Sequence, residues 1–131
     1  MNWERYKERV EEFGKALEKL KEIVMMKENE VVRDATIQRF EFTYELSWKA
    51  VKLNLQSKEI EARYPKEALQ EGLVAGLIDD GNLWSELQKM RNITSHTYDE
   101  EKAKEVYNFV KNHAARLFGE LYERLKKDLP K

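Results

Sequence analysis

The sequence predicts an all-α fold, an antiparallel up-and-down four-helix bundle with an additional short helix. Apolar residues recur at three- and four-residue steps along most of the 131-residue chain, which is the periodicity of amphipathic helices. No segment alternates apolar and polar residues as a half-buried strand would, and the connections between helical patterns are short. A chain of this length supports one core, so we expect a single domain over residues 1–131.

The first helix is predicted from Trp3 to about Lys27. Its apolar residues follow alternating three- and four-residue steps and therefore share one seam. This seam consists of Trp3, Tyr6, Val10, Phe13, Leu17, Leu20 and Val24. The opposite face carries mixed acidic and basic residues, which is typical of a surface exposed to water.

The second helix is predicted to begin at about Val31 or Arg33 and to end near Ser57. Its apolar residues fall on more than one stripe, since Ile37 and Phe42 point to different sides. A helix that is apolar on two sides contacts neighbours on both. We therefore expect this helix to be central.

The dipeptide Tyr64-Pro65 predicts the start of a third helix, because proline fits the first helical turn. Ala68, Gly72 and Gly76 then recur at every fourth residue. Glycine costs about 1 kcal/mol relative to alanine inside a helix. This row of small residues therefore predicts that another helix backbone approaches closely.

A turn-forming run at residues 79–82 leads into a short helix that ends around Ser95. Thr97 and Glu100 have the spacing of a capping box for the last helix, and Asp99 is an alternative N-cap. The apolar stripe of that helix comprises Ala103, Val106, Tyr107, Val110, Ala114, Leu117, Leu121 and Leu125.

The composition excludes several function classes. The chain has no cysteine, and therefore no disulfide, thiolate metal site or cysteine nucleophile. Its two histidines are far apart, so no metal or other cofactor is predicted.

The 24 Lys and Arg residues nearly balance the 25 Asp and Glu residues, giving a formal charge of -1. Broad nucleic-acid binding usually needs a basic surface, so any RNA contact is expected in a local cleft. The charged N-terminus and the lack of a long apolar run favour a cytoplasmic protein.

The greatest density of chemically useful side chains lies where the short helix ends and the last helix begins. These side chains are Arg91, Asn92, Thr94, Ser95, His96 and Tyr98. On a 3.6-residue period Arg91 and His96 point roughly 140° apart, so one chain does not converge them. A two-fold dimer would bring two copies of the junction to one cleft. We therefore expect a homodimer or a higher even oligomer.

Three motifs carry a resemblance to a known family. Arg91, His96 and Tyr98 form an Arg-x4-His-x-Tyr pattern that resembles the signature of HEPN-domain proteins of the HepT type, the toxin partners of minimal nucleotidyltransferases. Residues 37–49 and 76–84 resemble more narrowly the nucleotidyltransferase substrate-binding family within that superfamily. The resemblance covers nearly the whole chain. It implies a HEPN-like helical bundle and a separately encoded minimal nucleotidyltransferase as partner, in a toxin-antitoxin-like two-gene system.

The same resemblance implies roles for the residues of the junction. Arg91 and His96 would be catalytic in metal-independent RNA cleavage, because imidazole transfers protons near neutral pH and the arginine fork holds a phosphate. The candidate substrate-binding residues are Asn92, Thr94 and Ser95. Tyr98 would be the residue that the partner modifies with AMP, which would switch the site off by charge and volume.

The residues leave three functions open. The first is a partner subunit that binds or presents the nucleotide or RNA substrate of a separate nucleotidyltransferase. The second is an endoribonuclease toxin that is silenced when Tyr98 is adenylylated. The third is an oligomerising helical adaptor without a catalytic site, in which Arg91 pairs with a carboxylate such as Glu41 or Glu45 and His96 caps a helix.

Overall fold

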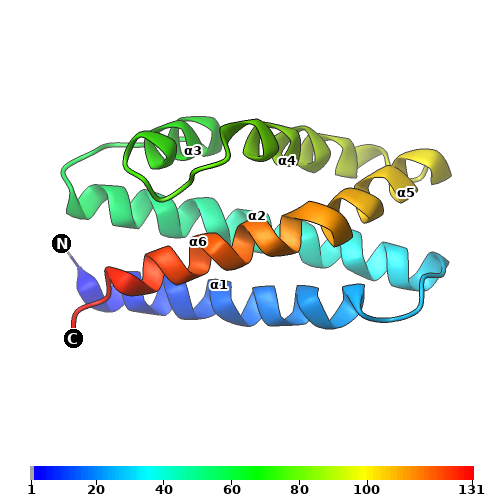
Figure 1. Ribbon diagram of the computed structural model, residues 1–131, viewed down its shortest axis with the longest axis horizontal. Coiled ribbons are helices and arrows are strands. Elements are labelled where there is room, and N and C mark those ends of the chain that lie inside the picture. The colour runs from blue at the N-terminus through cyan, green and yellow to red at the C-terminus, as the bar shows by residue number, and fades with distance from the viewer. Residues whose placement is uncertain (1) are drawn as a thin grey trace.

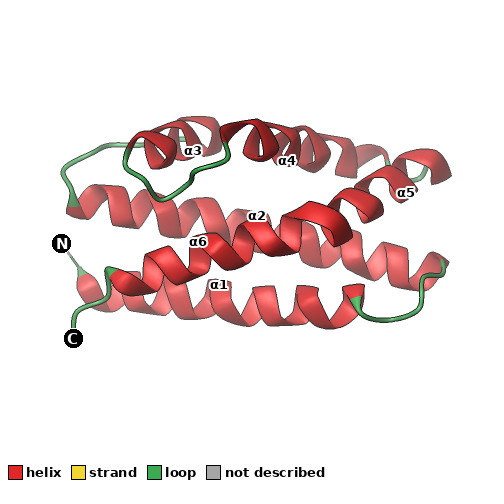
Figure 2. Cartoon of the chain, in the orientation of Figure 1, coloured by secondary structure: helices red, strands yellow, loops and turns green. Residues whose placement is uncertain are grey.

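The computed structural model describes residues 2–131 of the chain. This part of the chain contains helices and short loops and no strand (Figure 2). In chain order the helical elements are α1 (Trp3–Val24), α2 (Glu30–Ser57), α3 (Pro65–Val74), α4 (Gly81–Ile93), η1 (Thr94–His96), α5 (Glu100–Phe109), η2 (Val110–Ala114) and α6 (Ala115–Lys127). No helix within residues 2–131 is long and apolar enough to cross a membrane.

Four antiparallel rods make up the bundle (Figure 1). The long helices α1 and α2 lie side by side, α3 and α4 follow one another along α2, and α5 and α6 return across the bundle. The predicted all-α bundle with an additional short helix is therefore confirmed. The shortest α-helices are α3 and α5, with 10 residues each, rather than the 13-residue α4 that the sequence pattern suggested.

The central position predicted for the second helix is confirmed, because α2 packs against α1, α3, α4, α5 and α6. The predicted seam of α1 is buried at six of its seven positions. Trp3 is the exception, with 41% of its surface exposed. It is the first residue of the helix, and its ring meets only the edge of Tyr6, at a centroid distance of 5.8 Å.

The core is centred on Phe118, a fully buried aromatic residue of α6. Its ring lies 6.0 Å from Phe13 of α1, 6.1 Å from Phe40 of α2 and 5.8 Å from Trp84 of α4, measured between ring centroids. Aromatic pairs at these separations add to the free energy gained by burying their surface. One side chain therefore joins all four rods.

The close backbone approach predicted from the small-residue row of the third helix is found at neither glycine, although Gly72 packs tightly against α2. A Cβ atom at Gly72 would lie 3.2 Å from a methyl group of Val51 on α2, which is a close approach by a side chain rather than by backbone. Gly76 lies beyond the end of α3, has a φ of +82° and has open space around it. It terminates the helix, because only glycine adopts this conformation without strain.

The last predicted helix is interrupted by one π-helical turn, η2, between α5 and α6. The N-cap of α5 is Asp99, whose side chain accepts hydrogen bonds from the backbone N–H groups of Glu101 at 3.0 Å and Lys102 at 3.4 Å. The capping box based on Thr97 is therefore wrong and the alternative N-cap is right. At the other end of the sequence, α1 ends at Val24, before the predicted boundary at Lys27.

A buried polar network fixes α1 and α2 against the C-terminal end of α6. The Tyr6 hydroxyl donates to the backbone oxygen of Leu125 at 2.7 Å and accepts from the Asn54 side chain at 3.0 Å. Asn54 also donates to Asp128 at 2.8 Å. Burial, partly offset by the Asn54 hydrogen bond, raises the pKa of Tyr6 to about 12, so the phenol stays neutral and keeps its donor.

Candidate functional site

The candidate residues lie at the junction of α4, η1 and α5. Three hydroxyl groups here donate to backbone oxygens of the preceding turn: Thr94 to Arg91 at 2.6 Å, Ser95 to Asn92 at 3.0 Å, and Thr97 to Thr94 at 3.1 Å. Such bonds satisfy carbonyl groups that have no partner where a helix ends. The local sequence therefore builds the tight 3-10 turn that holds the junction in place.

Arg91 lies between the junction and the central helix. Its Nη1 donates to the Thr94 hydroxyl at 2.9 Å, and its guanidinium is 3.8 Å from Glu41 and 3.9 Å from Glu45 on α2. Both ion-pair distances are too long for direct hydrogen bonds. The pairing expected under the adaptor interpretation thus occurs with both carboxylates, but loosely.

The Arg91 side chain has remaining capacity to bind an anion. It is 30% exposed, and its Nε is buried without a hydrogen-bond partner among the described residues. A guanidinium group carries five N–H donors in a planar fork that matches a carboxylate or phosphate. Within residues 2–131 one of these donors makes a hydrogen bond to a protein side chain, at Thr94. The geometry therefore leaves Arg91 with N–H donors that can bind a phosphate at the end of α4.

His96 and Tyr98 form the outer part of the junction. Both side chains are exposed, Tyr98 to 87%, and their rings meet edge to face at a centroid distance of 6.2 Å. The backbone oxygen of His96 accepts from the N–H of Asp99 at 3.1 Å, which holds the turn closed. The His96 imidazole is thus accessible to a ligand at the surface.

The structure brings the predicted residues together as three pairs rather than as one cluster. Arg91 bonds Thr94, and Ser95 bonds the backbone of Asn92. His96 packs against Tyr98. Among the contacts of residues 2–131, no hydrogen bond or ion pair joins the Arg91 and His96 side chains, in agreement with the helical geometry of one chain.

Asn92 faces a hollow of about 420 Å³ between α2, α3 and α4. The hollow is polar and partly aromatic; its lining residues are Tyr44, Tyr64, Pro65, Lys66, Ser85, Gln88, Lys89 and Asn92. Burial raises the pKa of Tyr44, against an opposing effect of its hydrogen bond with Gln88, so this phenol is neutral at physiological pH. Asn92 therefore offers its amide to a neighbouring hollow and not to the Arg91 guanidinium.

One surface feature is absent from the sequence interpretation. A second hollow, between α1 and α2, is lined by four cationic side chains and Trp48. The four cations are Arg5, Arg9, Lys49 and Lys52. Like charges three or four residues apart repel each other on a helix surface. Such pairs in the sequence are the signal that could have indicated this hollow.

The family model described as nucleotidyltransferase substrate binding protein like matches residues 6–127. A curated Haemophilus influenzae protein named "Probable ribonuclease HepT" is 51% identical over 76 residues, which cover 54% of this chain and 52% of that protein. The chain thus spans about half the length of this curated relative.

Two solved structures are similar over most of their length. A crystal structure of a Thermus thermophilus protein has 36% sequence identity and a TM-score of 0.81, and the match covers 87% of this chain and 98% of that one. A Haemophilus influenzae protein, described as having the fold of a substrate binding domain of a nucleotidyltransferase, has 32% identity and a TM-score of 0.65. That match covers 95% of this chain and 99% of the other.

Proposed function

Because the chain belongs to the nucleotidyltransferase substrate binding protein like family, we propose that it is the HEPN-type partner subunit of a separately encoded minimal nucleotidyltransferase. In this role it binds or presents a nucleotide or RNA substrate, within a toxin-antitoxin-like two-gene system. The observation that carries the proposal is the family match over residues 6–127, which spans the whole bundle. The exposed junction of Arg91, His96 and Tyr98 supports it by supplying a cation, an imidazole and a phenol at the surface.

Co-expression with the transferase tests the partner role. The expected result is a stable complex that elutes as one species in size-exclusion chromatography. A matched control is the same chain co-expressed with a nucleotidyltransferase of the same size class from an unrelated gene pair, which should not co-elute. Failure of the cognate pair to associate, with both proteins folded, would refute the partner-subunit proposal.

A second candidate function is metal-independent RNA cleavage by Arg91 and His96. It is favoured by the 51% identity with a protein named as a probable ribonuclease. His96 would take the 2'-hydroxyl proton or protonate the leaving 5'-oxygen, and Arg91 would stabilise the charge that develops on the phosphate. The loose distances of 3.8 and 3.9 Å between Arg91 and its two carboxylates suit an arginine that exchanges partners when a phosphate arrives.

Replacing His96 or Arg91 by alanine is expected to lower RNA cleavage by about 10²-fold or more, with little change in thermal stability. Stability should persist because His96 is exposed, and because Glu41 and Glu45 are near 40% exposed and remain hydrated without Arg91. The measurement is cleavage of total RNA in EDTA, beside thermal unfolding of each variant. If Arg91→Ala unfolds the protein and the wild type shows no cleavage, Arg91 is a structural ion-pair residue and the adaptor interpretation holds.

The proposed cleft requires more than one copy of the chain. One chain leaves Arg91 turned towards α2 and His96 turned outwards, so a shared site needs a two-fold partner that supplies the second residue. We therefore propose a homodimer or a higher even oligomer. Light scattering at micromolar concentration should give a mass that is an even multiple of 15.7 kDa, and a monomer mass would contradict the shared cleft.

A further inference from the structure

The hollow between α1 and α2 is a concentrated positive surface on a protein of net charge -1. Its volume is about 400 Å³. The lining consists of Arg5, Arg9, Trp48, Lys49, Lys52, Leu53 and Gln56, and it contains no carboxylate. We refer to it as the basic hollow. A cavity wall with four cations and no anion attracts a negatively charged ligand.

The four cations are arranged as two pairs of neighbours. Arg5 and Arg9 are four residues apart on α1, and Lys49 and Lys52 are three residues apart on α2. Like charges at these spacings destabilise an isolated helix slightly. Arg9 is the one member of the basic hollow with an ion pair among the described residues, to Glu12 at 3.7 Å. Most of this positive charge is therefore not neutralised within the described part of the chain.

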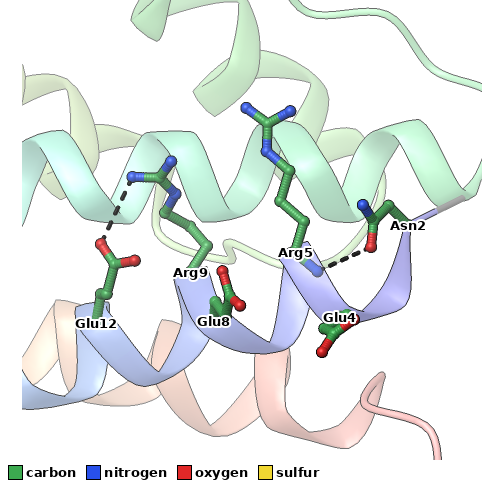
Figure 3. Close-up of a pocket in the computed structure, with 6 residues that line it drawn as sticks. All are labelled: Asn2, Glu4, Arg5, Glu8, Arg9 and Glu12. Atoms are coloured by element: carbon green, nitrogen blue, oxygen red, sulfur yellow. Dashed lines mark hydrogen bonds and ion pairs between the residues drawn. The ribbon is translucent and has the colours of Figure 1, made fainter.

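The Arg5 and Arg9 side chains extend towards α2, away from Glu4 and Glu8, and Glu12 extends with them as the ion-pair partner of Arg9 (Figure 3). Figure 3 shows the Arg5 and Arg9 side chains reaching across the α2 ribbon, whereas Glu4 and Glu8 stay close to α1. The Arg9 and Glu12 side chains are 25% and 54% exposed, and an ion pair of that kind contributes little free energy. Arg9 can therefore exchange Glu12 for a phosphate at small cost.

The basic hollow is connected to the junction through α2. The Trp48 indole N–H donates to Glu45 at 3.1 Å, and the other oxygen of Glu45 is 3.9 Å from Arg91. Glu41, Glu45, Trp48 and Lys52 follow four- and three-residue steps and share one face of α2. From Glu45 to Lys52 this face extends roughly 10 Å along the helix axis. Arg91 and the basic hollow therefore lie along the same face of α2, with Glu41 and Glu45 beside Arg91.

We propose that the basic hollow binds the phosphate groups of a single-stranded RNA, with a base stacked on Trp48. The inference rests on the proposed function and deepens it, because it names the substrate class and the surface that holds its backbone. Arginine forks and lysine ammonium groups are the usual partners of phosphate. An aromatic ring beside such cations is the arrangement that binds single strands without sequence preference. The half-buried Trp48, held by its hydrogen bond to Glu45, provides that ring.

The test is the fluorescence anisotropy of a labelled 2'-O-methyl oligonucleotide, which the protein cannot cleave. The variant is Lys49→Gln with Lys52→Gln, and the matched control is Lys7→Gln with Lys19→Gln, which removes the same charge from the exposed face of α1. We expect the first variant to bind about tenfold more weakly and the control to bind like the wild type. The slope of log K against log salt should fall in magnitude by about 0.7 for each lost phosphate contact on a single strand.

Three results would overturn the inference. The first is wild-type affinity and salt slope in the Lys49→Gln/Lys52→Gln variant, which would place the oligonucleotide elsewhere and leave the proposed function standing. The second is loss of transferase binding by this variant with oligonucleotide binding unchanged, which would make the basic hollow a protein-docking surface. The third is no oligonucleotide binding by the wild type. Because co-elution with the transferase is measured separately, this third result is distinguishable from failure of the partner-subunit proposal.

Discussion

Replacing Phe118 by alanine is expected to lower the free energy of unfolding by about 3–5 kcal/mol. Phe118 is fully buried, and its ring contacts Phe13, Phe40 and Trp84 from three other helices. Truncation would remove the buried ring and leave a cavity between the four rods. The rods cannot all move inwards to fill this cavity. Long helices held at several other points resist such a collapse, so most of the loss should persist.

Urea unfolding followed by far-ultraviolet circular dichroism measures this loss. The matched control is Phe42→Ala, the same truncation on α2 at a position that is 38% exposed. We expect the control to cost about 1 kcal/mol, which is typical of point mutations. Equal losses in the two variants would contradict the assignment of Phe118 as the residue that joins the rods.

The arrangement of helices could be predicted because hydrophobic periodicity alone determines most of it. The seam from Tyr6 to Val24 gives the correct buried face of α1. On α2 the side marked by Ile37 is buried, whereas Phe42, which marked the second side, is 38% exposed. Periodicity shows which residues share a face, but it does not show where along a helix the neighbouring helices end. Trp3 therefore belongs to the predicted apolar seam although 41% of its surface is exposed. The apolar pattern of a helix can continue beyond the last residue that has a packing partner on another helix.

Backbone irregularities could not be predicted in the same way. Gly76 continues the four-residue spacing of Ala68 and Gly72, yet its φ of +82° ends α3 before that position. The π turn at Val110–Ala114 inserts one residue into the helical repeat without breaking the apolar stripe around it. Both features depend on hydrogen bonding of the backbone, which leaves no distinct trace in the order of apolar residues.

The sequence indicated which polar residues gather at the junction of α4 and α5, and it indicated only some of their contacts. Helical geometry correctly indicated that Arg91 and His96 do not meet within one chain. The sequence named Glu41 and Glu45 as alternative partners of Arg91, and the packing of α4 on α2 decides that both carboxylates contact it. The basic hollow was missed because its cations come from two helices: the like-charge spacings within each helix are visible in the sequence, but their convergence on one surface depends on how α1 packs on α2.

Incubating the protein with the minimal nucleotidyltransferase proposed as its partner, ATP and magnesium is expected to place AMP on Tyr98. The Tyr98 side chain is 87% exposed, and its ring contacts only that of His96 among the aromatic residues described. The phenol oxygen would attack the α-phosphorus of ATP and release pyrophosphate. The phosphodiester formed would carry a negative charge beside His96, so it would repel an RNA phosphate and fill the space that the RNA occupies.

Intact mass and peptide mapping should show one added AMP on the wild type and none on Tyr98→Phe. The matched control is Tyr64→Phe, which removes a phenol that is 52% exposed near α3 and should leave the modification unchanged. Because the Tyr98 side chain is 87% exposed, removal of its hydroxyl should not alter thermal stability, and loss of the modification can be attributed to the missing acceptor. If an active, correctly paired transferase leaves the wild type unmodified, or modifies Tyr98→Phe equally, Tyr98 is not the acceptor. The junction would then act in substrate binding or cleavage without this covalent switch.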